Sequence, residues 1–240
     1  KVKNSLMPAT DYRLFMIYEA LKRGLRTVDE ICDETKIDKW FISKIKNLVD
    51  YEKSITGKKL TKAEYLAGKK YGYPDKVLRS ISGNELPAHR RAVYKMVDTC
   101  GAEFKAETPY FYSTYDDENE AEEFIAERGK TGKRRVIVFG SGPIRIGQGI
   151  EFDYASVHCV WALKEAGCEV AIVNNNPETV STDFDTADRL YFEPLTPEDV
   201  DNVIATEKPY GAVVAIGGQT AIKLTKHLSE SGVRILGTSA

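Results

Sequence analysis

A glycine-rich loop is the stretch of this 240-residue chain whose residue types could do chemistry. Gly140, Gly142, Gly147 and Gly149 follow a short apolar run and precede a helical pattern. Glycines let another group approach the main chain, and a helix N-terminus offers N–H groups and the positive end of its dipole. Arg145 adds a full positive charge. The loop therefore predicts a site that suits an anion, and a strand-to-helix turn without a ligand stays open as the alternative.

The loop does not match the standard nucleotide fingerprints. No Lys follows Gly147 or Gly149, as a P-loop requires. The dinucleotide pattern would need a glycine in place of Arg145 and an acidic residue after the second strand, where asparagines stand at 174–176. An NAD or FAD site is therefore not expected.

Two further polar segments follow predicted strands. Residues 174–183 follow the strand predicted at 169–173, and residues 217–220 follow the strand predicted at 212–216. Alternating strands and helices from about 132 to 240 predict a mostly parallel sheet with helices on both faces. The loops at the carboxyl ends of such strands gather along one edge. We therefore expect segments 140–151, 174–183 and 217–220 to form a small polar site that also holds the carboxylates of Glu151 and Glu178, although the spacing names no reaction.

Residues 1 to about 92 read as short helices. The first is expected over 11–23, with Thr10 as its N-cap and one apolar stripe made of Leu14, Ile17, Tyr18 and Leu21. A longer helix after residue 38 is expected to carry Phe41, Ile45, Leu48 and Val49 on one face. Capping boxes at 27–30 and 61–64 predict two further helix starts.

The second and third of these helices also resemble a DNA-binding helix-turn-helix, which would offer Ser43, Lys44 and Lys46 to a groove. Two observations disfavour DNA binding. The first helix of the pair is acidic, and the formal net charge of the chain is −2. A helix pair in a small bundle is the alternative.

The segment between the helices and the α/β part differs from both in composition and periodicity. Residues 93–115 are aromatic and irregular, so we expect them to pack on a neighbouring domain or on the preceding helices. Residues 116–132 have the composition of a linker. The predicted domains are therefore 1–130 and 132–240, with the boundary near Gly132.

Composition excludes several classes of protein. No apolar run approaches the roughly 20 residues of a membrane span, and no signal peptide opens the chain. The four cysteines show no metal-binding spacing, which fits a cytoplasmic protein with reduced thiols. The chain begins at Lys1 and stops directly after a predicted strand, so we expect an excised fragment.

Several long motifs resemble the carbamoyl-phosphate synthase large chain. They are Gly140–Tyr154, Asn176–Asp183, Arg189–Pro194 and Gly217–Thr220, joined by Tyr94–Cys100 and Thr108–Tyr115. The resemblance implies that residues 1 to about 130 are most of a helical oligomerisation domain. It implies that residues 132–240 are the Rossmann-like, mostly parallel α/β pre-ATP-grasp domain of the second, carbamate-phosphorylating unit. The residues of the motifs around Arg145 and Glu178 resemble those of the second unit rather than those of the first.

The resemblance also implies the activity of the parent protein. That ATP-dependent ligase makes carbamoyl phosphate from bicarbonate, ammonia and two MgATP (or the Mn²⁺ complex), for arginine and pyrimidine biosynthesis. A glutaminase small chain supplies the ammonia, and other copies of the large chain complete the oligomer. Neither nucleic acid nor a membrane is an expected partner. The chain itself is expected to hold no cofactor, metal or catalytic residue and to be inactive alone.

The resemblance further implies a sheltered passage for carbamate. Arg145, Gly147, Gly149 and Glu151 would form one wall of it, and Glu178 another. The supporting loops would contain Gly140, Gly142, Asn176, Thr179, Gly217, Gly218, Gln219 and Thr220. On the residues alone, each glutamate could equally be a capping carboxylate at a helix start or loop.

Overall fold

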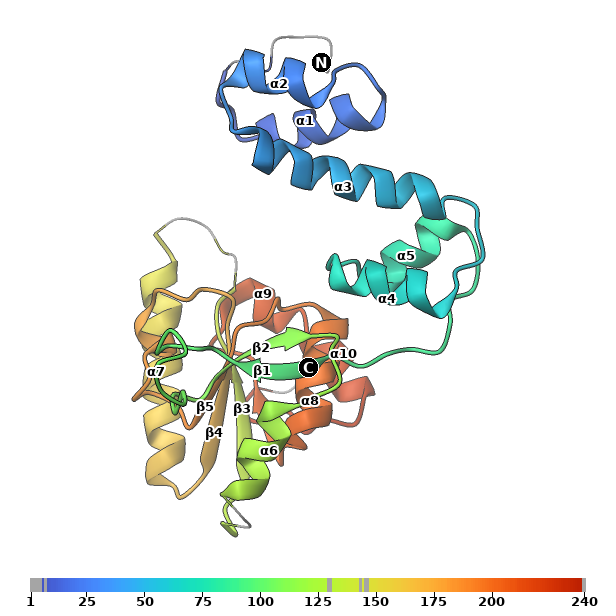
Figure 1. Ribbon diagram of the computed structural model, residues 1–240. Helices are drawn as coiled ribbons and strands as arrows, with labels where there is room; N and C mark the ends of the chain where they lie inside the picture. Colours follow the sequence, from blue (N-terminus) through green and yellow to red (C-terminus); the bar gives the residue numbers. More distant parts are fainter. Residues whose placement is uncertain (1–5, 7, 129–130, 143, 145–146, 239–240) are drawn as a thin grey trace. The chain divides into compact units, whose positions relative to one another are not determined.

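The computed structural model describes residues 6, 8–128, 131–142, 144 and 147–238. The chain forms two compact units, Lys1–His89 and Arg90–Ala240. The first unit is helical and the second combines helices with a mostly parallel sheet, as Figure 1 shows. The predicted fold class, a helical part followed by an α/β part, is confirmed.

The first unit has two small cores that share one long helix. Helix α3 spans Lys39–Ile55. Its amino-terminal half packs with α1 and α2 around a core that includes Ile17 and Ile31, and its end packs with α4 and α5 around Tyr65 and Leu78. The other four helices are α1 (Arg13–Lys22), α2 (Val28–Thr35), α4 (Lys62–Lys70) and α5 (Asp75–Ser82).

Both predicted capping boxes are present. The Oγ1 atom of Thr27 accepts the Glu30 N–H at 3.2 Å, and the Glu30 carboxylate accepts the Thr27 N–H at 2.7 Å. The same reciprocal pair starts α4 at residues 61 and 64. The prediction of Thr10 as the first N-cap is wrong, because the N-cap of α1 is Tyr12 and no side chain caps that helix. Thr10 contributes only its carbonyl, which accepts the Arg13 N–H.

The predicted apolar stripes of α1 and α3 extend beyond the cores. Ile17 and Leu21 are buried as expected, but 59% of Leu14 is exposed. In α3, Val49 is buried, whereas Phe41 is 58% exposed. The predicted stripes therefore include residues at both helix starts, Leu14 and Phe41, that the neighbouring helices do not cover.

The second unit contains a six-stranded sheet with the order β1-β2-β5-β4-β3-β6. All neighbouring strands are parallel except β1 and β2. The strand predicted directly before the end of the chain contributes only an isolated bridge between Ala212 and Ile235. The strands are β1 (Val93–Met96), β2 (Tyr110–Thr114), β3 (Arg135–Phe139), β4 (Glu169–Val173), β5 (Arg189–Tyr191) and β6 (Gly211–Val213).

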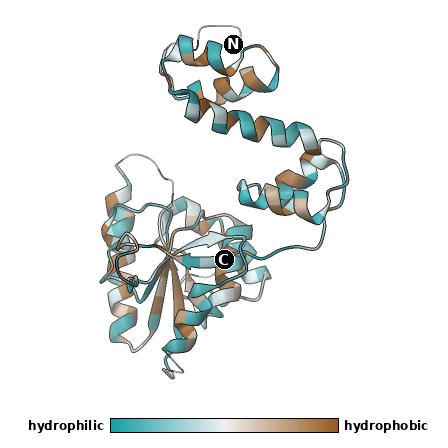
Figure 2. Cartoon of the chain, viewed as in Figure 1, coloured by the Kyte–Doolittle hydropathy of each residue, from teal (hydrophilic) through white to brown (hydrophobic). Residues whose placement is uncertain are grey.

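Helices cover both faces of this sheet (Figure 1). On one face, Phe139 and Val173 join a core with residues of α8 (Pro197–Glu207) and α10 (Thr225–Glu230). On the other face, Val138 and Ile172 pack with α7 (Gly149–Glu165). Both faces of the central strands are apolar, as the brown strands of Figure 2 show, because a parallel sheet is buried on both sides.

The aromatic segment predicted to be irregular forms β1 and β2. Phe111 is fully buried, and its ring lies 5.5 Å from that of Tyr191 on β5. The predicted linker contains α6 (Glu120–Glu127). Gly132 therefore lies inside the second compact unit, between α6 and β3, whereas the two units divide after His89. None of the helices in the described part of the chain has the length and apolarity to cross a membrane.

Candidate functional site

The three polar loops meet at the carboxyl edge of the sheet. The Gly140 N–H donates to the Val173 carbonyl at 2.9 Å, and a Cβ atom added to Gly140 would lie 2.8 Å from the Asn174 side chain. A Cβ atom added to Gly217 would lie 2.6 Å from the Gly140 carbonyl oxygen. Such distances are too short for any side chain, so these glycines permit the close approach of the loops. The expectation that the segments gather is confirmed for the described residues.

A buried carboxylate joins α7 to the asparagine-rich loop. Asp153 accepts the Ser181 N–H at 3.2 and 3.3 Å from its two oxygens. Asn174 is also buried, and its Oδ1 atom accepts the Asn176 N–H at 3.3 Å. Asn176 in turn accepts the Glu178 N–H at 3.1 Å. Side chains therefore hold the loop in successive Asx turns and fix the backbone at residue 178.

Sequence reasoning did not single out Asp153 or Asn174 as organisers of the loops. The available signal was an acidic residue within an otherwise apolar helix pattern and an asparagine directly after a buried strand. Both predicted carboxylates are exposed. Glu151 lies in the first turn of α7, where the helix dipole favours a carboxylate, and Glu178 lies in the loop that follows β4.

The glycines predicted for the passage have open space around them. A Cβ atom added to Gly147 or Gly149 would meet no atom within 4 Å. Gly147 needs its positive φ of 91°, whereas the backbone of Gly149 could carry a side chain. Arg145 lies outside the described residues, so its position relative to Glu178 stays a prediction.

The remaining predicted loop residues support the same edge. Thr179 donates its N–H to the Thr182 Oγ1 atom at 3.3 Å. A Cβ atom on Gly142, whose φ is 56°, would lie 3.3 Å from the Thr220 Cγ2 atom. Gly218 is buried against the Phe152 ring, and Gln219 is exposed.

Two family models match the chain. Residues 132–240 match the carbamoyl phosphate synthase preATP-grasp domain. Residues 1–97 match the oligomerisation domain of the carbamoyl-phosphate synthetase large chain. The chain belongs to the carbamoyl phosphate synthase large chain family.

Full-length relatives in this family align with the whole chain or most of it. The carbamoyl phosphate synthase large chain of Lachnoclostridium phytofermentans is 54% identical over 100% of this chain, and that of Agathobacter rectalis is 50% identical over 100%. The large chain of Caldanaerobacter subterraneus subsp. tengcongensis is 52% identical over 95% of it. The chain spans only 23%, 23% and 21% of the lengths of these relatives, respectively.

The motif Arg189–Pro194, which resembles the carbamoyl phosphate synthase large chain, has a structural role in this fold. The fully buried Arg189 guanidinium donates to the two Glu207 carboxylate oxygens at 2.6 and 2.9 Å and pairs with Glu169. Tyr191 donates to Glu207 at 2.6 Å. Burial alone would lower the pKa of Arg189, but the two carboxylates raise it above its ordinary value. Because Arg189 starts β5, this network lies at the amino edge of the sheet, opposite the loops.

The same motif contains a buried glutamate, Glu193, near its end. Glu193 is 1% exposed, and its Oε1 atom has no hydrogen-bond partner among the described residues. Burial raises the pKa of this carboxyl to about 7; hydrogen bonds from Ser113 oppose the increase, and the negative charge of Asp199 adds to it. Glu193 therefore keeps its proton in a substantial fraction of molecules near neutral pH and is largely protonated below it.

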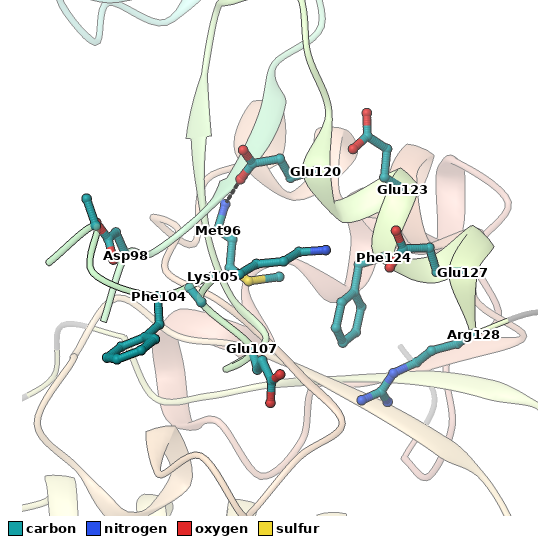
Figure 3. A pocket seen from close by; sticks show the side chains of 12 residues that line it. Met96, Asp98, Phe104, Lys105, Glu107, Glu120, Glu123, Phe124, Glu127 and Arg128 are labelled. Atoms are coloured by element: carbon teal, nitrogen blue, oxygen red, sulfur yellow. Dashed lines mark hydrogen bonds between the residues drawn. The ribbon is translucent and has the colours of Figure 1, made fainter. Parts of the chain in front are cut away.

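A pocket of about 630 Å³ lies away from the three loops. It is bounded by the β1–β2 connection and α6, and Figure 3 shows Lys105 extending into it from the connection. Met96 and Phe124 supply apolar surface, while Glu123 and Glu127 stand on the α6 side. None of its lining residues belongs to segments 140–151, 174–183 or 217–220, so the pocket is separate from the candidate site.

Proposed function

We propose that this chain works within a carbamoyl phosphate synthase large chain, as part of the unit that phosphorylates carbamate. The observation that carries the proposal is the packing of three family motifs at one sheet edge, where Gly140 and Gly217 leave no room for side chains. The complete protein would make carbamoyl phosphate from bicarbonate, glutamine-derived ammonia and two MgATP. A glutaminase small chain would release that ammonia.

The sheet edge would form one wall of a passage for carbamate. Carbamate is an anion that decomposes in water, so an enzyme that makes it at one place and uses it at another must shelter it. The open space at Gly147 and Gly149 would keep this passage wide. Glu151 and Glu178 are exposed beside it, and Arg145 would offset the charge of the travelling anion.

The chain would contribute this wall without performing phosphoryl transfer. The glycine loop lacks the lysine and hydroxyl residue that hold phosphate and Mg²⁺ in a P-loop. Asp153, the buried carboxylate at this edge, is occupied by the Ser181 N–H. The described residues therefore do not fit ATP and its metal ion, which would bind elsewhere in the complete protein. We expect no ATP hydrolysis by the purified chain.

The passage is tested by filling it. In a hybrid whose matching segment of the L. phytofermentans large chain is replaced by this chain, Gly149→Leu should abolish carbamoyl phosphate formation. Bicarbonate-dependent ATP hydrolysis should persist, because that step precedes the passage. Gly149→Ala is the matched control and should retain both activities, since residue 149 has space for a methyl group. Undiminished carbamoyl phosphate formation in the leucine variant would contradict the passage.

The first unit would supply an assembly surface. Its match to an oligomerisation domain covers all five helices. The competing function of its helix pair, DNA binding, is weaker because α2 carries acidic residues in its first turn and Trp40 and Phe41 are exposed at the start of α3. A DNA-reading helix presents polar groups to base edges there.

A further inference from the structure

The pocket between α6 and the β1–β2 connection has an apolar floor that the fold holds in place. Its volume of about 630 Å³ lies within the roughly 300–1,000 Å³ that small-molecule sites occupy. Met96, at the end of β1, and Phe124, on α6, are half-buried and form this floor. The Phe124 ring packs against the fully buried Phe111 ring, with centroids 5.7 Å apart. The apolar surface is therefore anchored to the core of the second unit before any ligand binds.

Two cations of the chain flank this floor. In Figure 3 the Phe124 ring lies between the Lys105 ammonium and the Arg128 guanidinium. The central carbon of that guanidinium lies 4.4 Å from the centre of the ring, which is a cation–π contact. Within the described ranges, the Lys105 ammonium forms no ion pair and no hydrogen bond, although it extends into the pocket. Lys105 and Arg128 can therefore receive the carboxylate of a ligand.

The α6 side of the pocket carries the opposite charge. Glu123 and Glu127 stand one helical turn apart on α6 and both line the pocket. Neither carboxylate has an ion pair or a hydrogen bond to another residue that the structure describes. Glu120, by contrast, is engaged, because it accepts the Met96 N–H at 2.5 Å. Since α6 ends at Glu127, the carbonyl groups of its last turn add negative potential here. This side of the pocket therefore suits an ammonium group.

We propose that this pocket binds a small zwitterion with an apolar body, of the chemical class of the apolar amino acids. Its carboxylate would lie against Lys105 and Arg128, its ammonium against Glu123 and Glu127, and its apolar side chain on the Phe124 ring. A ligand with only a positive charge would meet the two cations as like charges, and a simple carboxylic acid would meet the carboxylates of α6. The inference does not rest on the proposed passage, because the pocket is separate from the three loops.

The test titrates the chain with three probes that share one benzyl body. They are L-phenylalanine, 3-phenylpropionate, which lacks the ammonium, and 2-phenylethylamine, which lacks the carboxylate. Binding is followed by NMR through the backbone amide signals of Lys105 and Phe124. L-Phenylalanine should bind with a dissociation constant of about 2 mM or lower, in line with the affinities of ligands of this size. Each of the other probes should bind about tenfold more weakly or worse, because it lacks one charge-assisted contact.

Variants of the pocket assign the two charged ends of the ligand separately. Lys105→Met should weaken L-phenylalanine about tenfold and remove its advantage over 2-phenylethylamine, because the carboxylate loses its partner. Glu123→Gln/Glu127→Gln should weaken it by a similar factor and remove its advantage over 3-phenylpropionate. The matched control is Lys62→Met, at an exposed position of α4 in the first unit, and it should bind like the unaltered chain.

Three results would overturn the proposal. The first is the absence of a saturable change in both amide signals up to about 20 mM L-phenylalanine, ten times the expected dissociation constant. The second is equal affinity for the three probes, since the benzyl body alone would then account for binding. The third is unchanged affinity in Lys105→Met, or an equal loss in Lys62→Met. The amide spectrum of each variant shows whether it keeps the fold of the unaltered chain.

Discussion

Glu193 makes the stability of the second unit depend on pH. Its carboxyl has a pKa of about 7 in the folded chain, against an ordinary value of 4.5. Between these values the folded state binds more protons than the unfolded state, so the free energy of unfolding falls as pH rises. At 1.36 kcal/mol per pKa unit, the full loss is ~3 kcal/mol and is complete above about pH 8. Glu193→Gln removes the ionisation and should remove this loss.

The assay is urea unfolding followed by Trp161 fluorescence at pH values between about 4 and 8. A Trp40→Phe background leaves Trp161 as the only tryptophan, so that the signal reports the second unit. Relative to the starting protein, the Glu193→Gln variant should gain stability progressively as pH rises. Glu165→Gln, at an exposed position near the end of α7, is the control and should follow the starting protein. A constant difference between the Glu193→Gln and starting proteins across this range would refute the reasoning.

Four further outcomes are expected. Arg189→Met should destabilise the second unit by about 3–5 kcal/mol in urea unfolding, because the buried Glu207 carboxylate loses both of its guanidinium hydrogen bonds. A loss under about 1 kcal/mol would contradict the network. Gly217→Ala should lower the melting temperature far more than Gly149→Ala, since only the first added methyl meets backbone oxygens; equal effects would contradict this packing. Thr61→Ala should lower the free energy of unfolding of the first unit by about 1 kcal/mol, measured by thermal circular dichroism, because it removes the capping box of α4. An unchanged stability would contradict a contribution from this cap. The chain should not shift duplex DNA at moderate salt in a gel; a saturable shift would revive the helix-turn-helix interpretation.

Local signals in the sequence predicted much of the fold. The capping boxes were predictable because Thr27 and Glu30 are three residues apart and satisfy each other without help from distant parts. The meeting of the three loops followed from strand and helix alternation, since parallel strands place their carboxyl ends together.

Non-local features could not be predicted from the sequence. The pairing of β1 with β2 joins Tyr94 to Ser113 across a long irregular connection, and no periodicity in the sequence indicates it. The roles of Asp153 and Asn174 exist only once their loops meet. Periodicity likewise identified the apolar side of α3 but could not show that its neighbours stop short of Phe41.

Helix α3 fixes the distance between the two cores of the first unit. Its 17 residues correspond to about 25 Å at 1.5 Å per residue, and a separate core is fastened near each end. Neither core can slide toward the other without breaking the hydrogen bonds of the helix between them. A partner that binds to both ends of this unit would therefore need contacts at a fixed spacing. A kink introduced in the middle of α3 should lower its binding affinity even where every contacting side chain is unchanged.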